Sequence, residues 1–510
     1  MTSTTRRQFI ETSVAAASSA ALAGVVGCGR AGRAAGSHPN LLFVFPDQMR
    51  GQALGFLGED PVFTPNLDRF AAEGMALTQA AVNYPVCSPY RAMMLTGNYA
   101  HTNGVLGNCN SASSPFGYEL GESSQCWSDI LKNRGYSLGY IGKWHLDSPF
   151  RPYVGTSNNT EEMAWNEWTA PRRRHGFDYW YAYGTYDNHN KPEYWTTDAP
   201  RTERVVVDKW SPEHEADKAI EYIRNDGGSY RDSRKPFALV VSMNPPHMPY
   251  QLVPQKYLDM YGDATADDLV NRANVDLQHV FDPAQPNPHG DVGGLLTDGA
   301  DLARRHLKNY FAQTTGVDDQ FGRILAALGE AGLEEDTIVV FTSDHGNCIG
   351  CHNQVSKNVH YEESMRVPFL IRWPGVIQSG TDDLLLSTPD IFPTLLDLMG
   401  FTSDVPADTE GASHASLLLG GSGSRPSSQL YMWTPLGAPA MGRRGVRTLS
   451  HTMVVCRTEG RQPHYVLHDN VNDPYQLRNV ASERRDIVQD LIESELNPRL
   501  DRNRDPWLDV

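Results

Sequence analysis

The sequence predicts an α/β fold, in which helices flank a large, mostly parallel sheet and a smaller antiparallel sheet follows near the C-terminus. Continuous apolar runs, typical of parallel strands buried on both faces, recur between residues 40 and 342. Segments with apolar residues at three- and four-residue spacing, typical of helices, lie between these runs. Strands that alternate with helices favour a parallel sheet covered on both faces.

Four apolar runs are predicted strands, and each ends at residues that can do chemistry. The runs cover residues 40–45, 138–141, 237–243 and 338–342. The residues that follow or end them include Asp47, Lys143, His145, His247, Asp344 and His345. In an open α/β sheet, ligands bind beyond the carboxyl ends of parallel strands, so we expect these side chains to converge.

Helical periodicity predicts helices over residues 66–73, 127–134, 214–224 and 302–330. Residues 151–210 are rich in Trp, Tyr, Asn and Arg, and we expect them to form an insertion over the active-site face. Residues 262–300 are rich in Asp, Gly, Pro and Asn, which predicts a long excursion with little regular structure. Short antiparallel strands are expected within residues 445–455 and 464–468.

Length and charge limit the classes of function. A chain of 510 residues can bury a large core and predicts two domains, or one large domain with a smaller appendage. The formal net charge of −17 argues against a nucleic-acid-binding protein, because such proteins carry a basic face. An anionic substrate would therefore require positive charge concentrated at one place.

The N-terminal residues 1–36 have the pattern of an export signal. Arg6 and Arg7 precede the apolar stretch Val14–Val26, which resembles a twin-arginine signal and is too short and alanine-rich for a membrane-spanning helix. Val25-Val26-Gly27-Cys28 also resembles a bacterial lipobox, in which Cys28 would be lipidated. We expect an exported bacterial protein, either periplasmic or lipid-anchored at the cell envelope, with no other membrane attachment.

Seven cysteines are present, at positions 28, 87, 109, 126, 348, 351 and 456. Apart from Cys28 and Cys87, an odd number remains, which excludes a complete set of disulfides. Export permits disulfides, and Cys109 with Cys126 is a candidate pair. Cys348 and Cys351 have the spacing of a redox or half-zinc motif, but no second such motif completes a zinc site, so we expect a local disulfide or two buried thiols.

The most informative segment is Cys87-Ser88-Pro89-Tyr90-Arg91, which Thr96-Gly97 follows. This pattern resembles that of the formylglycine-dependent sulfatases, the type I sulfatases of the alkaline-phosphatase-like superfamily. The resemblance extends over residues 38–482 and implies an alkaline-phosphatase-like fold. It implies a catalytic domain over residues 38–385 and a C-terminal subdomain over residues 386–510.

The resemblance implies a role for Cys87. In that family a separate maturing enzyme oxidises the cysteine to formylglycine, whose hydrate attacks sulfur and later expels inorganic sulfate. A thiolate would instead leave an adduct with no easy route to turnover. Arg91 lies one helical turn after Cys87, where its guanidinium would hold the hydrate and balance negative charge.

A metal site is also implied. Carboxylates at strand ends, such as Asp47 and Asp344, suit a hard divalent cation. The family's usual site has a second acidic residue after the first and an asparagine after the later one, whereas this chain has Gln48 and His345. The resemblance implies Ca²⁺ held by Asp47, Gln48, Cys87, Asp344 and His345. Mg²⁺, Mn²⁺ and Zn²⁺ remain alternatives, the last two because imidazole favours softer ions.

Cationic residues in three further motifs match the family. Gly142-Lys143-Trp144-His145 and Pro246-His247-Met248-Pro249 resemble its lysine and histidine motifs, and Lys357 falls where it places a second lysine. The resemblance implies that Lys143 and Lys357 bind sulfate oxygens, that His145 contacts the hydrate, and that His247 donates a proton to the leaving alcohol. Positive groups around a doubly negative transferring group are what transition-state stabilisation requires.

Two segments are candidates for substrate contacts, and each has a structural alternative. The run Arg172-Arg173-Arg174-His175 either binds a second anionic group of a polysaccharide or forms a solvated loop. The aromatic residues 179–186 either stack on a sugar or form a buried strand.

The resemblance implies a sulfuric ester hydrolase that acts on a sulfated carbohydrate. The Asp-Gln and Asp-His pairings also occur in the phosphonate monoester hydrolase branch of the superfamily, so a phosphonate or phosphate ester is an alternative substrate. A further alternative is an inactive binding protein in which Cys87 stays unmodified.

Overall fold

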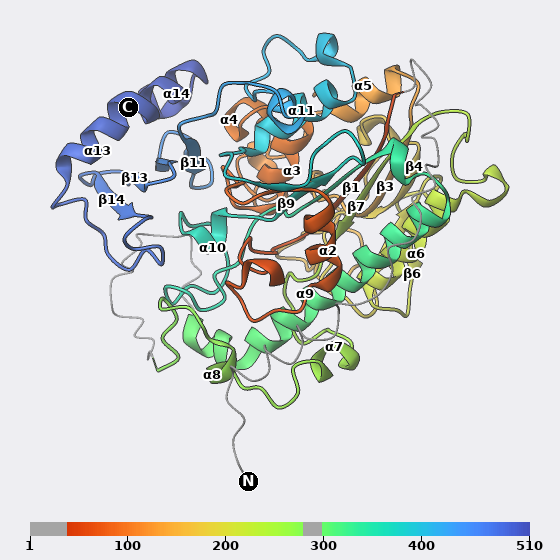
Figure 1. Cartoon of the computed structure of the whole chain (residues 1–510), viewed down its shortest axis with the longest axis horizontal. Coiled ribbons are helices and arrows are strands. Elements are labelled where there is room, and N and C mark those ends of the chain that lie inside the picture. The colour runs from red at the N-terminus through yellow and green to blue at the C-terminus, as the bar shows by residue number, and fades with distance from the viewer. Residues whose placement is uncertain (1–37, 279–297, 510) are drawn as a thin grey trace, which may run out of the picture. The chain divides into compact units, whose positions relative to one another are not determined.

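Ten strands form the main sheet, in the order β10-β2-β9-β8-β1-β7-β3-β4-β5-β6 (Figure 1). They are β1 (Asn40–Pro46), β2 (Met75–Leu77), β3 (Ser137–Lys143), β4 (Tyr179–Tyr183), β5 (Glu193–Thr196), β6 (Val205–Val206), β7 (Phe237–Met243), β8 (Thr337–Thr342), β9 (Phe369–Arg372) and β10 (Gly380–Asp382). The central strands β8, β1, β7, β3 and β4 are parallel. Antiparallel pairings link β9 to β8 and to β2, and β5 to β4 and to β6.

The structure, a computed structural model, describes residues 38–278 and 298–509. The predicted export signal over residues 1–36, with Cys28, therefore lies outside the described residues and stays a prediction. Part of the predicted excursion over residues 262–300 lies outside them as well. In the described part of the chain, no helix combines the length and the apolar character needed to cross a membrane.

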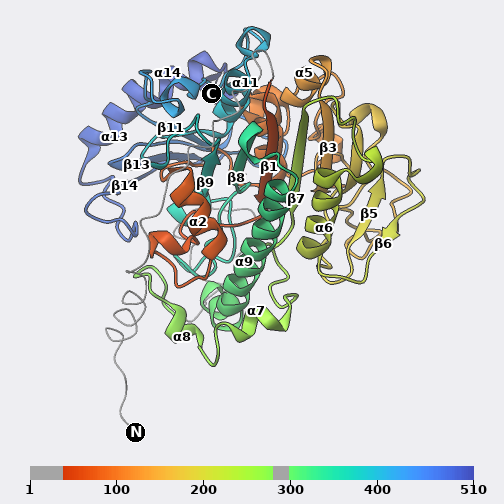
Figure 2. The same cartoon turned by 45° about the vertical axis from the view of Figure 1, so that its right-hand side comes forward.

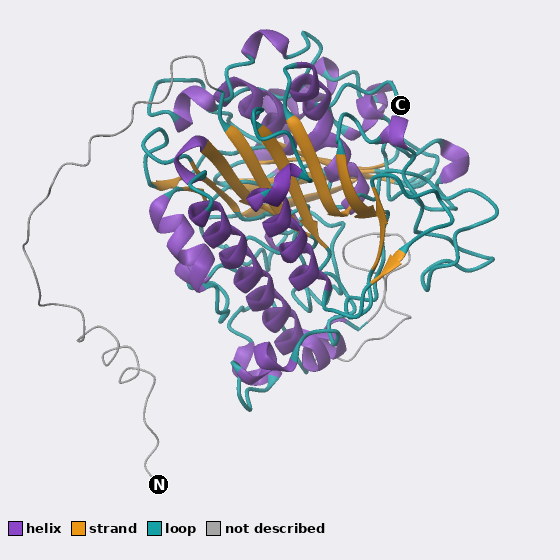
Figure 3. Ribbon diagram, turned by 90° about the vertical axis from the view of Figure 1, so that its right-hand side faces the viewer, coloured by secondary structure: helices purple, strands orange, loops and turns teal. Residues whose placement is uncertain are grey.

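Helices cover both faces of the sheet (Figures 2 and 3). They are α2 (Pro65–Glu73), α3 (Cys87–Thr96), α4 (Ala100–Asn103), α5 (Trp127–Asn133), α6 (Ser211–Arg224), α7 (Gln255–Asp259), α8 (Ala266–Leu269), α9 (Gly299–Glu330), α10 (Glu362–Met365), α11 (Ile391–Leu398), α12 (Ala415–Leu418), α13 (Arg485–Leu491) and α14 (Asn497–Arg502). The α/β class predicted from the sequence is confirmed.

Strand β1 shows why the apolar runs are continuous. Its alternate side chains enter two separate cores: Phe43 packs with residues of α3, α5 and α11, whereas Val44 packs with residues of α2, α6 and α9. Both faces of this central parallel strand are buried, so every position after Asn40 is apolar. The four predicted strands and the four predicted helices are all present, with ends that differ by at most three residues.

The predicted insertion over residues 151–210 contributes three strands to the main sheet. It contains β4, which extends the parallel part of the main sheet, and the short strands β5 and β6. Trp180 of β4 is buried and stacks on Tyr140 of β3, with ring centroids 5.4 Å apart. The aromatic segment is therefore a buried strand, and its side chains in β4 fill the core rather than an open sugar site.

A second sheet contains four antiparallel strands, β11 (Gln429–Trp433), β12 (Gly442–Arg447), β13 (His451–Arg457) and β14 (His464–Asp469). The predicted stretch over residues 445–455 is a hairpin of two strands, and β11 was not predicted. Apolar residues of this sheet share a core with Val86 and Met93, which belong to the segment around α3. The boundary at residue 385 between two domains is not tested by the structure and stays a prediction.

The cysteine predictions are partly wrong. The six cysteines in the described part of the chain are all free, so the candidate disulfide between Cys109 and Cys126 does not form. Cys126 instead caps the N-terminus of α5, and burial raises its pKa well above the usual value. Cys348 and Cys351 are two buried thiols, which was one of the two alternatives.

Helix α6 buries a carboxyl group against the sheet. Oε1 of Glu215 accepts hydrogen bonds from the hydroxyls of Tyr183 at 3.2 Å and Tyr194 at 3.1 Å. Burial raises the pKa of Glu215 to about 8, and the two hydroxyls only partly offset this effect. The native protein therefore keeps a proton that an unfolded chain would release near pH 4.5.

We expect Glu215 to make the protein less stable as the pH rises from about 4.5 to about 8. Over this range the native state binds more protons than the unfolded state, so stability falls with pH. The variant Glu215→Gln cannot ionise and should not show this loss. Between pH 6 and pH 8, urea unfolding should show the wild type losing about 2 kcal/mol relative to the variant. A difference independent of pH would contradict the buried, protonated Glu215.

Candidate active site

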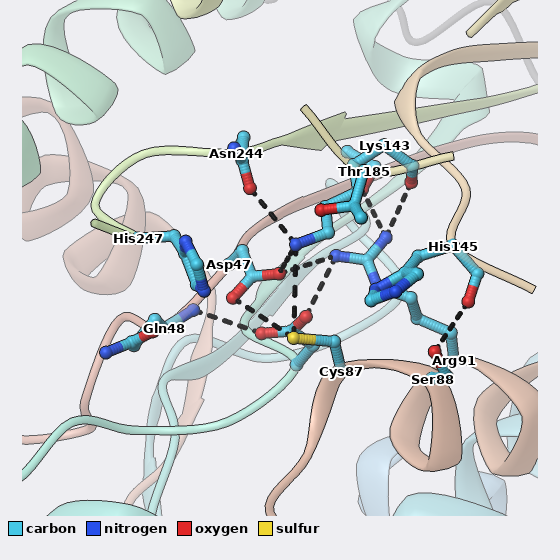
Figure 4. A network of polar contacts seen from close by, with 12 residues as sticks. Asp47, Gln48, Cys87, Ser88, Arg91, Lys143, His145, Thr185, Asn244 and His247 are labelled. Atoms are coloured by element: carbon cyan, nitrogen blue, oxygen red, sulfur yellow. Dashed lines mark hydrogen bonds and ion pairs between the residues drawn. The ribbon is translucent and has the colours of Figure 1, made fainter. Parts of the chain in front are cut away.

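Four strand ends meet at the candidate active site (Figure 4). Asp47 follows β1, Lys143 ends β3, Asn244 follows β7 and Asp344 follows β8. These strands are neighbours in the parallel part of the sheet, so their carboxyl ends lie side by side. The predicted convergence of residues that are distant in the sequence is confirmed.

Cys87 is the first residue of α3 and lies at the centre of this group. Its Sγ lies 3.3 Å from Nε2 of His345 and 3.8 Å from Oδ1 of Asp47. The Nζ atoms of Lys357 and Lys143 lie 3.6 and 3.9 Å from the same sulfur. Burial, followed by Asp47, raises the pKa of Cys87 to about 11 although both lysines lower it. At neutral pH the unmodified residue is therefore a thiol, which is a poor nucleophile.

Arg91 connects α3 to two strand ends. It lies four residues after Cys87, on the same face of the helix, and its side chain is buried. One Nη atom donates to the carbonyl of Lys143 at 2.6 Å, and the other lies 2.8 Å from Oδ2 of Asp344 and 3.3 Å from Oδ2 of Asp47. The guanidinium therefore pairs with both carboxylates and fixes their orientation.

The two lysines flank the thiol from different segments. Nζ of Lys143 lies 2.7 Å from Oδ2 of Asp47 and donates to Oδ1 of Asn244 at 3.2 Å. Nζ of Lys357 donates to Oε1 of Gln48 at 3.0 Å. Lys357 comes from the loop between β8 and α10, so only the fold brings it to Cys87.

Asp47 and Asp344 are both fully buried. Burial would raise the pKa of Asp47, but nearby cationic groups, Lys143 first, outweigh it and hold the pKa well below the usual value. Burial, followed by the charge of Asp47, raises the pKa of Asp344. Two adjacent carboxylates compete for the same cations, so a further positive charge would stabilise the ionised form of both.

The residues of this site fit a divalent cation. Ligand atoms of Asp47, Cys87, Asp344 and His345 all lie within 4.8 Å of one another, and all four residues are buried. Nδ1 of His345 lies 2.9 Å from the carbonyl of Gly346, and burial, followed by Lys357, lowers the pKa of the imidazole well below its usual value. A neutral imidazole that donates from Nδ1 offers the Nε2 lone pair to a metal.

The amide of Gln48 contacts protein groups. Its Nε2 donates to the hydroxyl of Tyr250 at 3.1 Å and to Oγ of Ser356 at 3.2 Å, while Oε1 accepts from Lys357. The backbone N–H donates to Oδ1 of Asp344 at 3.0 Å. The residue has a φ of 70°, in the left-handed region. Gln48 thus supports both Asp344 and Lys357, and its role as a metal ligand stays a prediction.

His145 follows β3 and is buried beside α3. Its carbonyl accepts a hydrogen bond from Oγ of Ser88 at 2.7 Å, and its Nε2 lies 3.1 Å from the carbonyl of Cys109. Burial, followed by Lys143, lowers the pKa of His145 well below the usual value. The Nδ1 atom has no hydrogen-bond partner in the described part of the chain, so its lone pair is available.

His247 is the more open of the two histidines, with 14% of its side chain exposed. Nδ1 lies 2.8 Å from the carbonyl of Met248 and 3.7 Å from Oδ1 of Asp187. Burial, followed by Lys357, lowers the pKa of the imidazole well below its usual value. An anionic substrate near the lysines would oppose part of this effect and favour the protonated form.

A comparison with protein families matches the family described as Sulfatase to residues 39–401. The chain belongs to the sulfatase family. A second family description, N-sulphoglucosamine sulphohydrolase, C-terminal, matches residues 350–505 of this sulfatase. It is accordingly a sulfuric ester hydrolase with an alkaline-phosphatase-like fold.

Several relatives cover nearly the whole sulfatase. An endo-4-O-sulfatase of Bacteroides thetaiotaomicron is 38% identical over 503 residues, which cover 92% of this chain and 93% of the relative. An ulvan-active sulfatase of Formosa agariphila is 33% identical over 470 residues, and the match covers 91% of this chain and 81% of the relative. A solved structure from work on glycosaminoglycan metabolism by Bacteroides thetaiotaomicron has a TM-score of 0.83 and 38% identity. The superposed region covers 92% of this sulfatase and 98% of the chain in that structure.

The basic run over residues 172–175 is mostly structural in this sulfatase. Arg173 forms an ion pair with Asp147, and Arg174 donates to the carbonyl of Thr197 at 2.6 Å. Only Arg172 has a largely exposed side chain. The run is therefore not a ready-made site for a second anion.

Sequence reasoning missed the polar residues that hold the charged ones in place. Asn244 binds Lys143, Ser242 accepts a hydrogen bond from Arg91 at 2.8 Å, and Tyr250 binds Gln48. Asn244 could have been found, since it directly follows a predicted strand. Ser242 lies inside an apolar run and gives no signal of its own.

Proposed function

We propose that this sulfatase hydrolyses sulfate esters of a polysaccharide, with formylglycine formed from Cys87 by a maturing enzyme and with Ca²⁺ as the metal. One observation carries the proposal: Cys87 lies between two lysines, a neutral histidine and two buried carboxylates. Relatives named for endo-4-O-sulfatase and ulvan activity support a polysaccharide as the substrate.

When bound, the aldehyde hydrate and the cation would supply a nucleophile and Lewis-acid polarisation at sulfur. Asp47, Asp344 and His345 would hold the cation, with Gln48 as a further ligand. Lys143 and Lys357 would bind the sulfate oxygens, because both Nζ atoms already lie within 3.9 Å of Cys87. Their fixed charges would stabilise the negative charge that develops on the transferring group.

The two histidines are assigned different proton transfers. His247 would protonate the oxygen of the leaving alcohol from Nε2, since its Nδ1 already lies at hydrogen-bond distance from a carbonyl. His145 would accept a proton at Nδ1 when inorganic sulfate is released. We expect the His145→Ala variant to cleave the sulfate ester once and then to stall with sulfate still bound to the enzyme.

The modification of Cys87 is tested directly by mass spectrometry. Protein purified from its native host is digested, and the peptide that contains Cys87 is analysed. Replacement of the thiol by an aldehyde supports the proposal, together with release of sulfate from sulfated oligosaccharides. An unchanged thiol and no sulfate release would favour the inactive binding protein.

Asp47→Asn is expected to remove metal binding and activity together. The change deletes one negative charge from the donor set while it keeps the shape of the side chain. Metal content, measured by inductively coupled plasma mass spectrometry after dialysis, should fall by about tenfold or more. The matched control is Asp383→Asn, an exposed carboxylate that pairs with Arg425. Retained metal in Asp47→Asn would refute the assignment.

Gln48 and His345 support a second candidate substrate, a phosphonate or phosphate ester. Compared with the aspartate and the asparagine of the family's usual site, Gln48 supplies one less negative charge and His345 supplies an imidazole. Turnover of an aryl sulfate and of the matching aryl phosphonate by the same preparation separates the two. A higher kcat/KM for the phosphonate would replace the sulfate ester in the proposal.

Export remains part of the proposal on sequence grounds. Replacing Arg6 and Arg7 by lysine should retain the protein in the cytoplasm if the signal is of the twin-arginine type.

Cys28→Ser should abolish labelling by a radioactive fatty acid if the protein is lipid-anchored, and should change nothing if it is simply periplasmic.

A further inference from the structure

A cavity of about 470 Å³ lies in the small antiparallel sheet. Its lining includes Trp433, Leu436, Met441, Arg443, Cys456 and Arg457. This volume is within the range of sites for small ligands, about 300–1,000 Å³. An aromatic ring and arginines in one concave site are a combination that suits a sugar with an anionic group.

The cavity adjoins the active site through two contacts. Nη1 of Arg443 lies 3.5 Å from the carbonyl of Asn358, the residue after Lys357. The backbone N–H of Thr434, the residue after Trp433, donates to the hydroxyl of Tyr84 at 3.2 Å, three residues before Cys87. A ligand in the cavity would therefore lie beside the segments that carry Cys87 and Lys357.

Arg443 is a buried cation that lacks an acidic partner. Only 3% of the residue is exposed, and its guanidinium carbon lies 5.0 Å from the ring centroid of Trp433. Among the ion pairs between described residues, none joins Arg443 to a carboxylate. Glu459 also lines the cavity, but it is exposed and forms no ion pair with Arg443 in the described part of the chain. Because a buried charge is costly without a counter-charge, the site favours an anionic ligand.

We infer that this cavity binds an anionic sugar next to the sulfated sugar of the substrate. Trp433 would provide an apolar surface for the sugar ring, and Arg443 would pair with a carboxylate or a second sulfate on it. The inference rests on the proposed function, since it assigns a second subsite to the same polysaccharide. Such a subsite would make this sulfatase selective for sulfate esters inside a charged polymer rather than for isolated sulfated sugars.

Leu436 offers a test that leaves the buried residues unchanged. Its side chain is 50% exposed at the cavity, so substitutions there should fold. Leu436→Glu adds a negative charge, and Leu436→Gln is the matched neutral control of nearly equal size. With a sulfated oligosaccharide that has a uronate neighbour, KM should be about threefold higher for the glutamate variant, and the difference should shrink at high salt.

Three substrates identify the anionic group. In each, the sulfated sugar is joined to a neighbour that is a uronate, a second sulfated sugar, or a neutral sugar. The inference is supported if the KM values of the two Leu436 variants differ with either anionic neighbour and agree with the neutral one. The neighbour that gives the difference then identifies the anionic group. Equal KM values for the two variants with both anionic neighbours, or the same difference with the neutral one, would overturn it.

Trp433→Ala gives an independent measurement. The loss in kcat/KM on the uronate-containing oligosaccharide should exceed the loss on a small aryl sulfate by about tenfold, mainly through KM. Trp433→Phe should restore most of it, and the exposed Arg484→Gln should change neither substrate. Equal losses on both substrates would overturn the subsite. Failure of the wild type to release sulfate from any ester would instead refute the proposed function, so the two failures are distinguishable.

Discussion

Cys87→Ala is expected to lower kcat for sulfate ester hydrolysis by about 10⁵-fold or more. Among the described residues of the site, only Cys87 has a side chain that contacts both Lys143 and Lys357. Without the sulfur, Cβ of residue 87 carries no thiol that a maturing enzyme can replace by the aldehyde oxygen. Sulfate release from an aryl sulfate and from a sulfated oligosaccharide measures the effect, and both should be lost together.

The matched control for this variant is Cys126→Ser. Cys126 is another buried and free cysteine, and serine can take over its role at the N-cap of α5. Both variants should melt within a few degrees of the wild type, which separates loss of chemistry from loss of fold. Residual turnover of Cys87→Ala near the wild-type rate would disprove any nucleophile derived from this residue.

His247→Ala is expected to affect substrates according to their leaving group. A sugar alcohol is a poor leaving group and needs a proton as the bond to sulfur breaks, whereas a nitrophenol leaves readily as the anion. The variant should therefore lose about 10²–10⁴-fold in kcat on a carbohydrate sulfate and much less on 4-nitrophenyl sulfate. Steady-state kinetics on the two substrates gives the ratio.

The control is His464→Ala, because His464 is an exposed residue of β14. It should leave the ratio of the two rates as in the wild type. If His247→Ala lowered both rates equally, His247 would bind the sulfate group rather than protonate the leaving oxygen, and another acid would have to be found.

Much of the active site could be predicted because its residues directly follow buried strands. A strand covered on both faces is apolar at nearly every position, so Asp47 and Asp344 stand out where their strands end. The side chain of Ser242 gave no such signal, since one hydroxyl within an apolar run is also common in a core. Its bond to Arg91 depends on how α3 is placed over the sheet.

Regions without such a pattern were predicted less well. The aromatic segment in β4 fits both a buried strand and a sugar site, and the neighbouring β3 decides between them because it buries Trp180. The candidate disulfide between Cys109 and Cys126 was wrong because spacing along the chain does not tell whether two thiols meet in space.

The sequence alone determined the class of fold, the segment around Cys87 and most of the charged residues beside it, because these depend on periodicity and on local motifs. The tertiary structure decided which charges neutralise one another and which stay without a partner. Arg91 and Arg443 are both buried arginines, yet the first meets two carboxylates and the second meets none among the described residues. That difference arises from distances between segments that are remote in the chain, and no pattern of neighbouring residues encodes it.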